Sequence, residues 1–140
     1  MAKAKRMDWP QLCALALGLG LPHVVETTSW GQPVLKAHGK LWAWWSPHED
    51  AAVFKVALAE REILIEAEPE RFFCTPHYKA HGLVLMRPEK FDRIWAAANL
   101  VKVWRAQAPK RALKAYDAMD ERTAREHRRP GVVARTVDRV

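Results

Sequence analysis

The four residues Lys-Ala-His-Gly occur twice in this chain, at positions 36–39 and 79–82, and each copy lies between two short apolar runs. Glycine at the fourth place supplies the positive φ that a tight turn needs, and β-forming residues stand on both sides. The phrase therefore predicts two β-hairpins with basic tips. Connections this short join strands in opposite directions, so an antiparallel sheet is expected.

The tips of these two hairpins are candidates for phosphate contact. If the hairpins lie side by side, their tips carry Lys36, Lys40 and Lys79, and His38 and His81 can add charge at mildly acid pH. Surface hairpins also end in Lys and Gly for solubility and turn chemistry alone. Both interpretations remain open from the sequence.

The net charge of +7 is concentrated at the two ends of the 140-residue chain. Residues 1–6 and residues 121–140 each carry +3, and residues 7–120 carry only +1. Basic ends can hold a polyanion through counterion release, but they can equally serve solubility. We expect a basic tail over 1–7, one domain over 8–120, and an Arg-rich, loosely held tail over 121–140.

The two cysteines and the hydropathy pattern indicate a cytoplasmic protein. Cys13 and Cys74 show no CxxC or Cys/His ligand spacing, so reduced thiols are expected. No apolar run approaches the length of a membrane span, and the basic start lacks a following apolar segment. Neither membrane insertion nor secretion is predicted.

The periodicity of apolar residues predicts an α+β fold of two layers, with a five-stranded antiparallel sheet and helices packed on it in the order α-β-β-β-α-β-β-α-α. The stretch 26–30 is followed closely by Gly31 and Pro33, so an irregular turn or bulge is expected there. Predicted helices cover a segment from Trp9 to Gly18 or Gly20, then 58–67, 89–107 and a short segment after Pro109. Predicted strands cover 34–37, 40–46, 51–57, an arm near 72–78, and 83–87.

Tryptophans are concentrated in the predicted strand 40–46. Strict alternation puts Trp42 and Trp44 on one face and Leu41, Ala43 and Trp45 on the other. One face belongs to the core. The other exposes Trp42 and Trp44 unless a helix or loop covers them.

Motifs of catalysis are missing from the sequence. It contains no Gly-rich phosphate loop, no GxSxG elbow and no HExxH. His77 and His81 are four residues apart, but on a hairpin arm and its tip this spacing does not bring two side chains together. We expect a non-enzymatic protein without a metal site or a cofactor.

The phrase Thr75-Pro76-His77-Tyr78 has two interpretations. Together with Trp30 and Trp44, the residues Thr75, His77 and Tyr78 could line a pocket that stacks a planar ligand. Alternatively, Pro76 restricts the entry to a strand, Tyr78 packs in the core, and His77 bonds to a neighbouring backbone group.

Four phrases, in this order over about residues 8–116, resemble the MmcQ/YjbR-like family of small bacterial proteins. The resemblance implies a two-layer α/β domain with an antiparallel sheet and a paired-hairpin feature described as a double-wing DNA-binding motif. It implies no catalytic residues. The phrases are Thr28-Ser29-Trp30-Gly31 with Pro33 and Lys36, then Lys40-Leu41-Trp42-Ala43-Trp44, then Phe73-Cys74-Thr75-Pro76-His77-Tyr78, and finally Ala108-Pro109-Lys110-Arg111.

Three functions follow as hypotheses. Lysines on two wings would contact DNA phosphates weakly and with tolerance of sequence. A protein-interaction module, including a homo-oligomer, would use the Trp-rich face of strand 40–46. A small-ligand protein would use the neighbourhood of Trp30, His77 and Tyr78.

Overall fold

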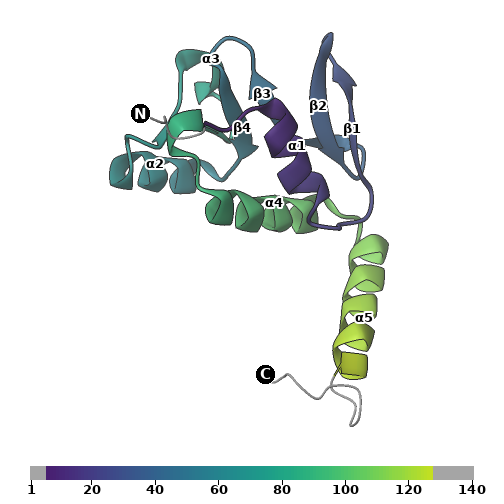
Figure 1. Ribbon diagram of the computed structural model, residues 1–140. Coiled ribbons are helices and arrows are strands. Elements are labelled where there is room, and N and C mark those ends of the chain that lie inside the picture. The colour runs from purple at the N-terminus through teal and green to yellow at the C-terminus, as the bar shows by residue number, and fades with distance from the viewer. Residues whose placement is uncertain (1–5, 128–140) are drawn as a thin grey trace, which may run out of the picture. The chain divides into compact units, whose positions relative to one another are not determined.

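A six-stranded antiparallel sheet organises residues 6–107 in the computed structural model of the protein (Figure 1). The structure describes residues 6–127, with side chains as far as residue 123. Strands neighbour each other in the order β1-β2-β3-β4-β6-β5. They are β1 (Val24–Ser29), β2 (Gln32–Ala37), β3 (Lys40–Ser46), β4 (Ala51–Lys55), β5 (Phe72–Phe73) and β6 (Leu83–Met86).

Helices lie on both faces of this sheet. α1 and α4 contact each other and pack on one face, which we call the helix face, while the short α3 packs on the other, the α3 face. α2 contacts β5 and β6. The predicted α+β class is confirmed, with six strands instead of five. The helices are α1 (Trp9–Leu17), α2 (Leu58–Ala67), α3 (Pro76–Lys79), the 3-10 turn η1 (Pro88–Lys90) and α4 (Arg93–Gln107).

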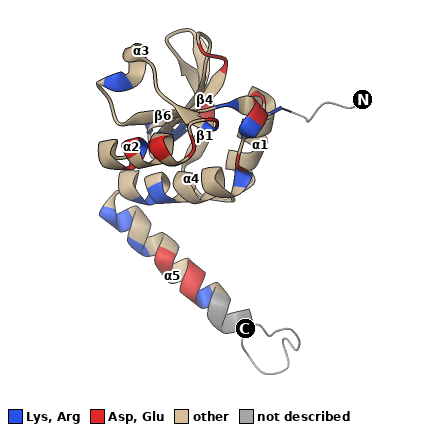
Figure 2. Ribbon diagram, turned by 90° about the vertical axis from the view of Figure 1, so that its left-hand side faces the viewer, with Lys and Arg blue, Asp and Glu red and all other residues tan. Residues whose placement is uncertain are grey.

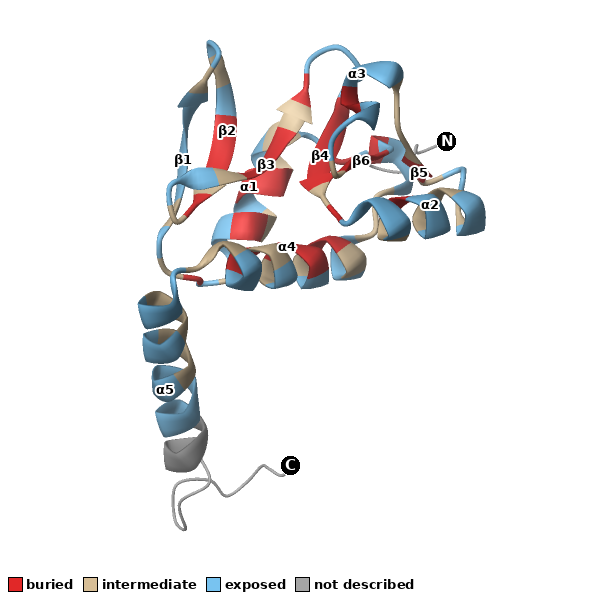
Figure 3. Cartoon of the chain, turned by 180° about the vertical axis from the view of Figure 1, so that it is seen from behind, coloured by how far each residue is buried: buried red, intermediate tan, exposed pale blue. Residues whose placement is uncertain are grey.

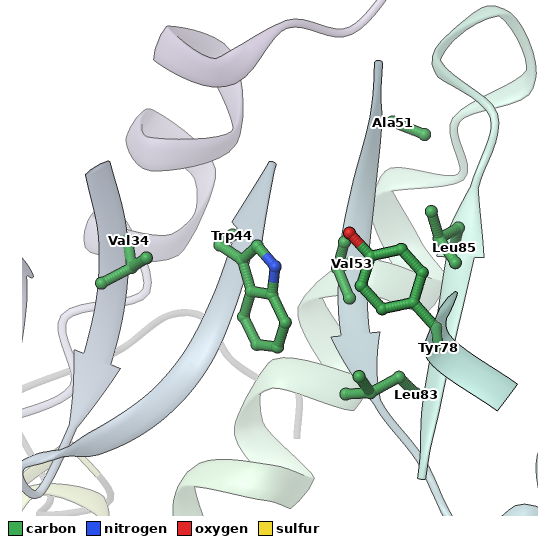
Figure 4. Packing of buried hydrophobic residues seen from close by; sticks show 7 residues of the cluster. All are labelled: Val34, Trp44, Ala51, Val53, Tyr78, Leu83 and Leu85. Carbon is green, nitrogen blue, oxygen red and sulfur yellow. The ribbon is translucent and has the colours of Figure 1, made fainter. Parts of the chain in front are cut away.

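Alternation along β4 divides the core between these two faces, because successive strand residues point to opposite sides. Phe54 meets the Trp95 ring of α4 edge-on at 5.3 Å on the helix face. Val53 instead belongs to the cluster that Trp44 and Tyr78 form on the α3 face (Figure 4). Strands β3, β4 and β6 are therefore buried on both sides, whereas β1 is largely exposed (Figure 3).

The prediction of an irregular turn or bulge near residue 31 is wrong, because β1 is a regular strand that pairs with β2. Trp30 and Gly31 have φ values of 53° and 76° and alone connect β1 to β2. Positive φ at both central residues is the geometry of a type I′ turn, which suits the twist of two adjacent strands. Pro33 pairs only with β1, so its missing N–H costs no bond to β3.

The two copies of the repeated phrase have different structures. His38 and Gly39, with φ values of 57° and 79°, form the tight turn between β2 and β3, as predicted. The second copy is not a hairpin tip. Pro76 opens the single-turn helix α3, which ends at Lys79 before the chain enters β6. A proline fits the first turn of a helix because its missing N–H is not needed there.

A β-bulge separates the two tryptophans that alternation had placed on one face. Leu35 pairs with Ala43 and Lys36 pairs with Leu41, so Trp42 is the extra residue of β3. Trp42 turns to the helix face, where its Nε1 donates to the Leu100 carbonyl at 2.9 Å. Both tryptophans are buried, which contradicts the hypothesis of an exposed Trp-rich face for partners or homo-oligomers.

α4 is shorter than the predicted helix 89–107 and buries one side against the sheet. The helix begins only at Arg93, where the Asp92 carboxylate accepts from the Trp95 backbone N–H at 3.0 Å. Its buried side chains are Ala96, Asn99, Leu100 and Trp104, whereas Ile94 is 84% exposed. Asn99 fixes this rotation because its Nδ2 donates to the Lys55 carbonyl at 3.1 Å.

Residues 108–140 form a second unit, whose described part is the helix α5 (Lys110–His127). Its half-buried residues include Ala112, Leu113 and Tyr116, at the predicted helical spacing. The helix continues through residues 121–127, the start of the segment expected to be a loose tail. The remainder of that segment lies outside the described residues. None of the described helices is long and apolar enough to cross a membrane.

The last residues of the predicted N-terminal tail pack on the domain. Met7 is buried, and its backbone N–H donates to the Pro88 carbonyl at 3.0 Å. Arg6 pairs with Asp50 at 3.0 Å. Both cysteines are free thiols, and burial, reinforced by Glu26, raises the pKa of Cys13 to about 12.

Candidate nucleic-acid interface

The sheet brings both copies of the repeated phrase to one of its ends. β4 runs antiparallel to β3 and to β6, so its last residue lies where those two strands begin. Lys40 is the first residue of β3, and Leu83, which follows the second copy, is the first residue of β6. Lys55 ends β4 between them. We call this region the basic sheet end and define it by Lys40, Lys55 and the residues 79–82.

Lys55 is a cation of this region that sequence analysis did not single out. Its Nζ donates to Gln107 Oε1 at 2.8 Å, and Gln107 Nε2 donates to the Ala37 carbonyl at 3.0 Å. Partial burial and the charge of Lys40 lower the pKa of Lys55. The signal in the sequence was a lysine within the otherwise apolar predicted strand 51–57.

The lysines of this surface lack acidic partners. Within the described part of the chain, no carboxylate forms an ion pair with Lys36, Lys40, Lys55 or Lys79. Elsewhere, Lys102 pairs with Glu60 at 3.1 Å. The described residues therefore supply no ion pair to the positive charges at the basic sheet end.

Lys36 and Lys79 are placed differently from Lys40. Lys36 lies within β2, half-buried, and pairs with Leu41, which packs against the cluster of the α3 face. Lys79 is exposed at the end of α3, the blue segment of that helix in Figure 2. Neither residue occupies a hairpin tip, and both belong to the α3 side of the sheet.

His38 serves packing more than charge. Its ring contacts Trp104 at 4.8 Å and His23 at 5.5 Å, and its backbone N–H donates to the His23 carbonyl at 2.8 Å. Burial lowers the pKa of His38, and the charges of His23 and Lys40 act in the same direction, opposed by a bond to the Trp104 backbone. The imidazole is therefore neutral at neutral pH. His81, in contrast, is exposed.

Arg61 of α2 holds the second copy of the phrase in place. It is only 4% exposed, and its guanidinium donates to the carbonyls of Lys79, His81 and Leu83 at 3.0, 2.8 and 3.2 Å. Its ion-pair partner, Glu62, is largely exposed. No local signal in the sequence marks Arg61 as a buried anchor.

The predicted pocket around Tyr78 is not assembled. Trp44 and Tyr78 are buried in the cluster of the α3 face, where Tyr78 donates to Ser46 Oγ at 2.8 Å. Trp30 is 77% exposed at the β1–β2 turn and joins neither of them. His77 is exposed and faces the ring of His48 at 6.0 Å. Thr75 precedes α3, and its buried Oγ1 has no hydrogen-bond partner in the described structure.

The described residues also form a cavity away from these positions. One cavity of about 220 Å³ lies where α1, η1 and the start of α4 meet, lined by Met7, Gln11, Pro88, Glu89, Phe91 and Arg93. Within residues 6–127, no three His, Cys, Asp or Glu side chains are grouped so that they could hold a metal ion.

Comparison with known proteins identifies the family. No curated protein matches the chain. The fold is similar to the crystal structure of the Deinococcus radiodurans protein DR2400, a DUF419 domain, with 17% identity and a TM-score of 0.59 over 79% of this chain and 84% of that chain. The YjbR family model matches residues 19–106, more than half of the sequence. The predicted resemblance is thus confirmed, and the chain belongs to the YjbR family.

Proposed function

We propose that the protein binds DNA without catalysis, weakly and with tolerance of sequence, through phosphate contacts by Lys36, Lys40 and Lys79. The observation that carries this proposal is the convergence of both copies of the repeated phrase on the basic sheet end, on either side of β4. The β2–β3 turn would act as one wing. The connection from α3 to β6, held by Arg61, would act as the other.

The chemistry of these side chains suits phosphates more than bases. Lysine presents a point charge on a flexible stem and can follow a backbone of any sequence. α4 packs one side against the sheet, and the proposal assigns no helix to a major groove. Binding therefore gains its free energy mainly from the release of counterions.

The salt dependence of binding follows from this mechanism. Three phosphate contacts give a slope of log K against log salt of about −2.7, which lowers the affinity ~40-fold between ~50 mM and ~200 mM salt. Fluorescence anisotropy with two duplexes of unrelated sequence measures both quantities. We expect similar affinities for the two duplexes.

Triple substitution of Lys36, Lys40 and Lys79 by Ala should abolish most of this binding. A matched control replaces Lys90, Arg93 and Lys102 by Ala, which removes the same charge from other parts of the domain. We expect the control to retain most of the affinity. An equal loss in both triple variants, or an affinity of the unmodified protein that does not change with salt, contradicts the proposal.

A further inference from the structure

The ammonium group of Lys55 is positioned to bind an anion, and the described residues supply none. An ammonium group has three N–H donors, and the described contacts of Lys55 use one, toward the neutral oxygen of Gln107. Gln107 is itself anchored to the Ala37 carbonyl, which restricts the position of the lysine. The ammonium is thus partly desolvated and positioned, with two donors left for an external acceptor.

The neighbours of Lys55 reinforce this demand for negative charge. Lys40 is near enough to act electrostatically on both Lys55 and His38, and His38 acts as a neutral ring. Within the described residues, no carboxylate pairs with either lysine. Partial burial of a cation without a negatively charged partner costs free energy of folding. Stability alone therefore does not explain a lysine at this position.

We propose that Lys55 and Lys40 together bind one phosphate group at the end of β4. The inference rests on the proposed function in that this phosphate is taken to be part of a DNA backbone. The inference goes beyond the proposed function because it assigns the tightest phosphate contact to Lys55, which lies between the two copies of the repeated phrase. The exposed lysines around Lys55 make weaker contacts. A charge-assisted bond from a partly desolvated ammonium is stronger than one from a fully hydrated side chain.

The variant Lys55→Met separates a binding role from a structural one. Methionine retains most of the apolar stem and removes the charge. We expect the affinity for a short duplex to fall about tenfold at low salt and the salt slope to decrease by ~0.9. The melting temperature should remain unchanged or rise, because a destabilising cation has been removed. Lys102→Met, whose ammonium already pairs with Glu60, is the control and should retain DNA affinity.

A titration followed by NMR of the lysine ammonium signals identifies the source of the phosphate. A shift of the Lys55 signal with duplex DNA but not with inorganic phosphate supports a backbone phosphate. A shift with inorganic phosphate as well supports a site that accepts a free phosphate group.

The failures of the two proposals are distinguishable. If the unmodified protein binds DNA and Lys55→Met binds it equally well, the Lys55 site is wrong and the proposed function stands. If the unmodified protein binds no DNA, the proposed function is wrong, and the inorganic phosphate titration decides the site. If inorganic phosphate then causes no shift of the Lys55 ammonium signal, the proposed Lys55 site is wrong.

Discussion

The two glycines of the repeated phrase illustrate how identical residues meet different physical requirements. Gly39 has a φ of 79° and open space around the position of a Cβ, so it is needed for its backbone conformation. Gly82 has no positive φ, but a Cβ there would lie 2.6 Å from the Val56 carbonyl oxygen. The same backbone pair is joined by a bond from the Val56 N–H to the Gly82 carbonyl at 3.0 Å.

Alanine at these two positions should therefore have unequal costs. Gly39→Ala forces a side chain into the left-handed region and should cost about 1 kcal/mol of the free energy of unfolding. Gly82→Ala must separate the ends of β4 and β6, and we expect a cost of about 3 kcal/mol. Urea denaturation measures both. A cost for Gly82→Ala no larger than that for Gly39→Ala would show that the backbone moves freely there.

His38 should make stability depend on pH. Its folded-state pKa lies below the ordinary value of 6.5, so the unfolded chain binds the proton more readily. Stability should thus be complete above pH 6.5 and decrease as the pH falls through the folded-state pKa. His38→Asn removes the titration and retains a residue that tolerates positive φ before Gly39.

Melting temperatures between about pH 7.5 and about pH 5 measure this effect. The decrease in the unmodified protein should become smaller in His38→Asn. The exposed His81, at the same place in the second copy, provides the control, and His81→Asn should leave the decrease unchanged. If both variants have the pH profile of the unmodified protein, carboxylates and not His38 determine it.

At the scale of elements, α2 and the connection to β6 form one structural unit through Arg61. This side chain donates to the carbonyls of Lys79, His81 and Leu83, and the His81 carbonyl also accepts from the Leu83 backbone N–H at 2.8 Å. Arg61→Met removes the guanidinium donors from these carbonyls in a largely buried region. We expect a loss of about 3 kcal/mol in the free energy of unfolding, by urea denaturation.

The comparison variant for Arg61 is Glu62→Gln, which removes its exposed ion-pair partner. Such pairs contribute little, so a change below ~0.5 kcal/mol is expected. If Arg61→Met also costs less than this, the carbonyls find water, and Arg61 does not hold the second wing. The DNA affinity of Arg61→Met provides a second readout, because a loosened connection displaces Lys79.

Local signals predicted some elements and not others. α2 was predicted with its observed bounds, because its charged and apolar residues separate at helical spacing and Pro69 follows it. The bulge at Trp42 depends on the pairing of β3 with β2, which alternation within one strand cannot reveal. β1 was missed because Gly31 and Pro33 signal a turn without showing that the turn is only two residues long.

The candidate site was predicted only in part, because local signals do not show which distant residues come into contact. Lys40 was placed correctly beside a hairpin turn, whereas Lys79 lies at the end of α3 and not at the predicted hairpin tip. Lys55, Arg61 and the packing of His38 on Trp104 depend on residues between 18 and 66 positions apart in the chain. Such contacts are set by the topology of the sheet, which no single phrase encodes.

At the scale of the whole molecule, positive charge is distributed over two units. Residues 108–140 carry a net charge of +4 and residues 1–107 carry +3. The YjbR family match ends at residue 106, so the more basic unit lies outside it. Under the proposed function, the second unit would supply a general attraction to polyanions, and the family domain would supply the particular lysine contacts.

Both ends of β2 are fixed by two-residue turns, at Trp30 and Gly31 and at His38 and Gly39. Insertion of one residue between them would invert the side chains of the strand and move Val34 or Leu35 to the wrong face. We therefore expect a change of length within these six residues to be tolerated less well than a change of length in a loop. Among related sequences, the spacing between the two turn glycines should be inherited unchanged, even where the residues between them differ.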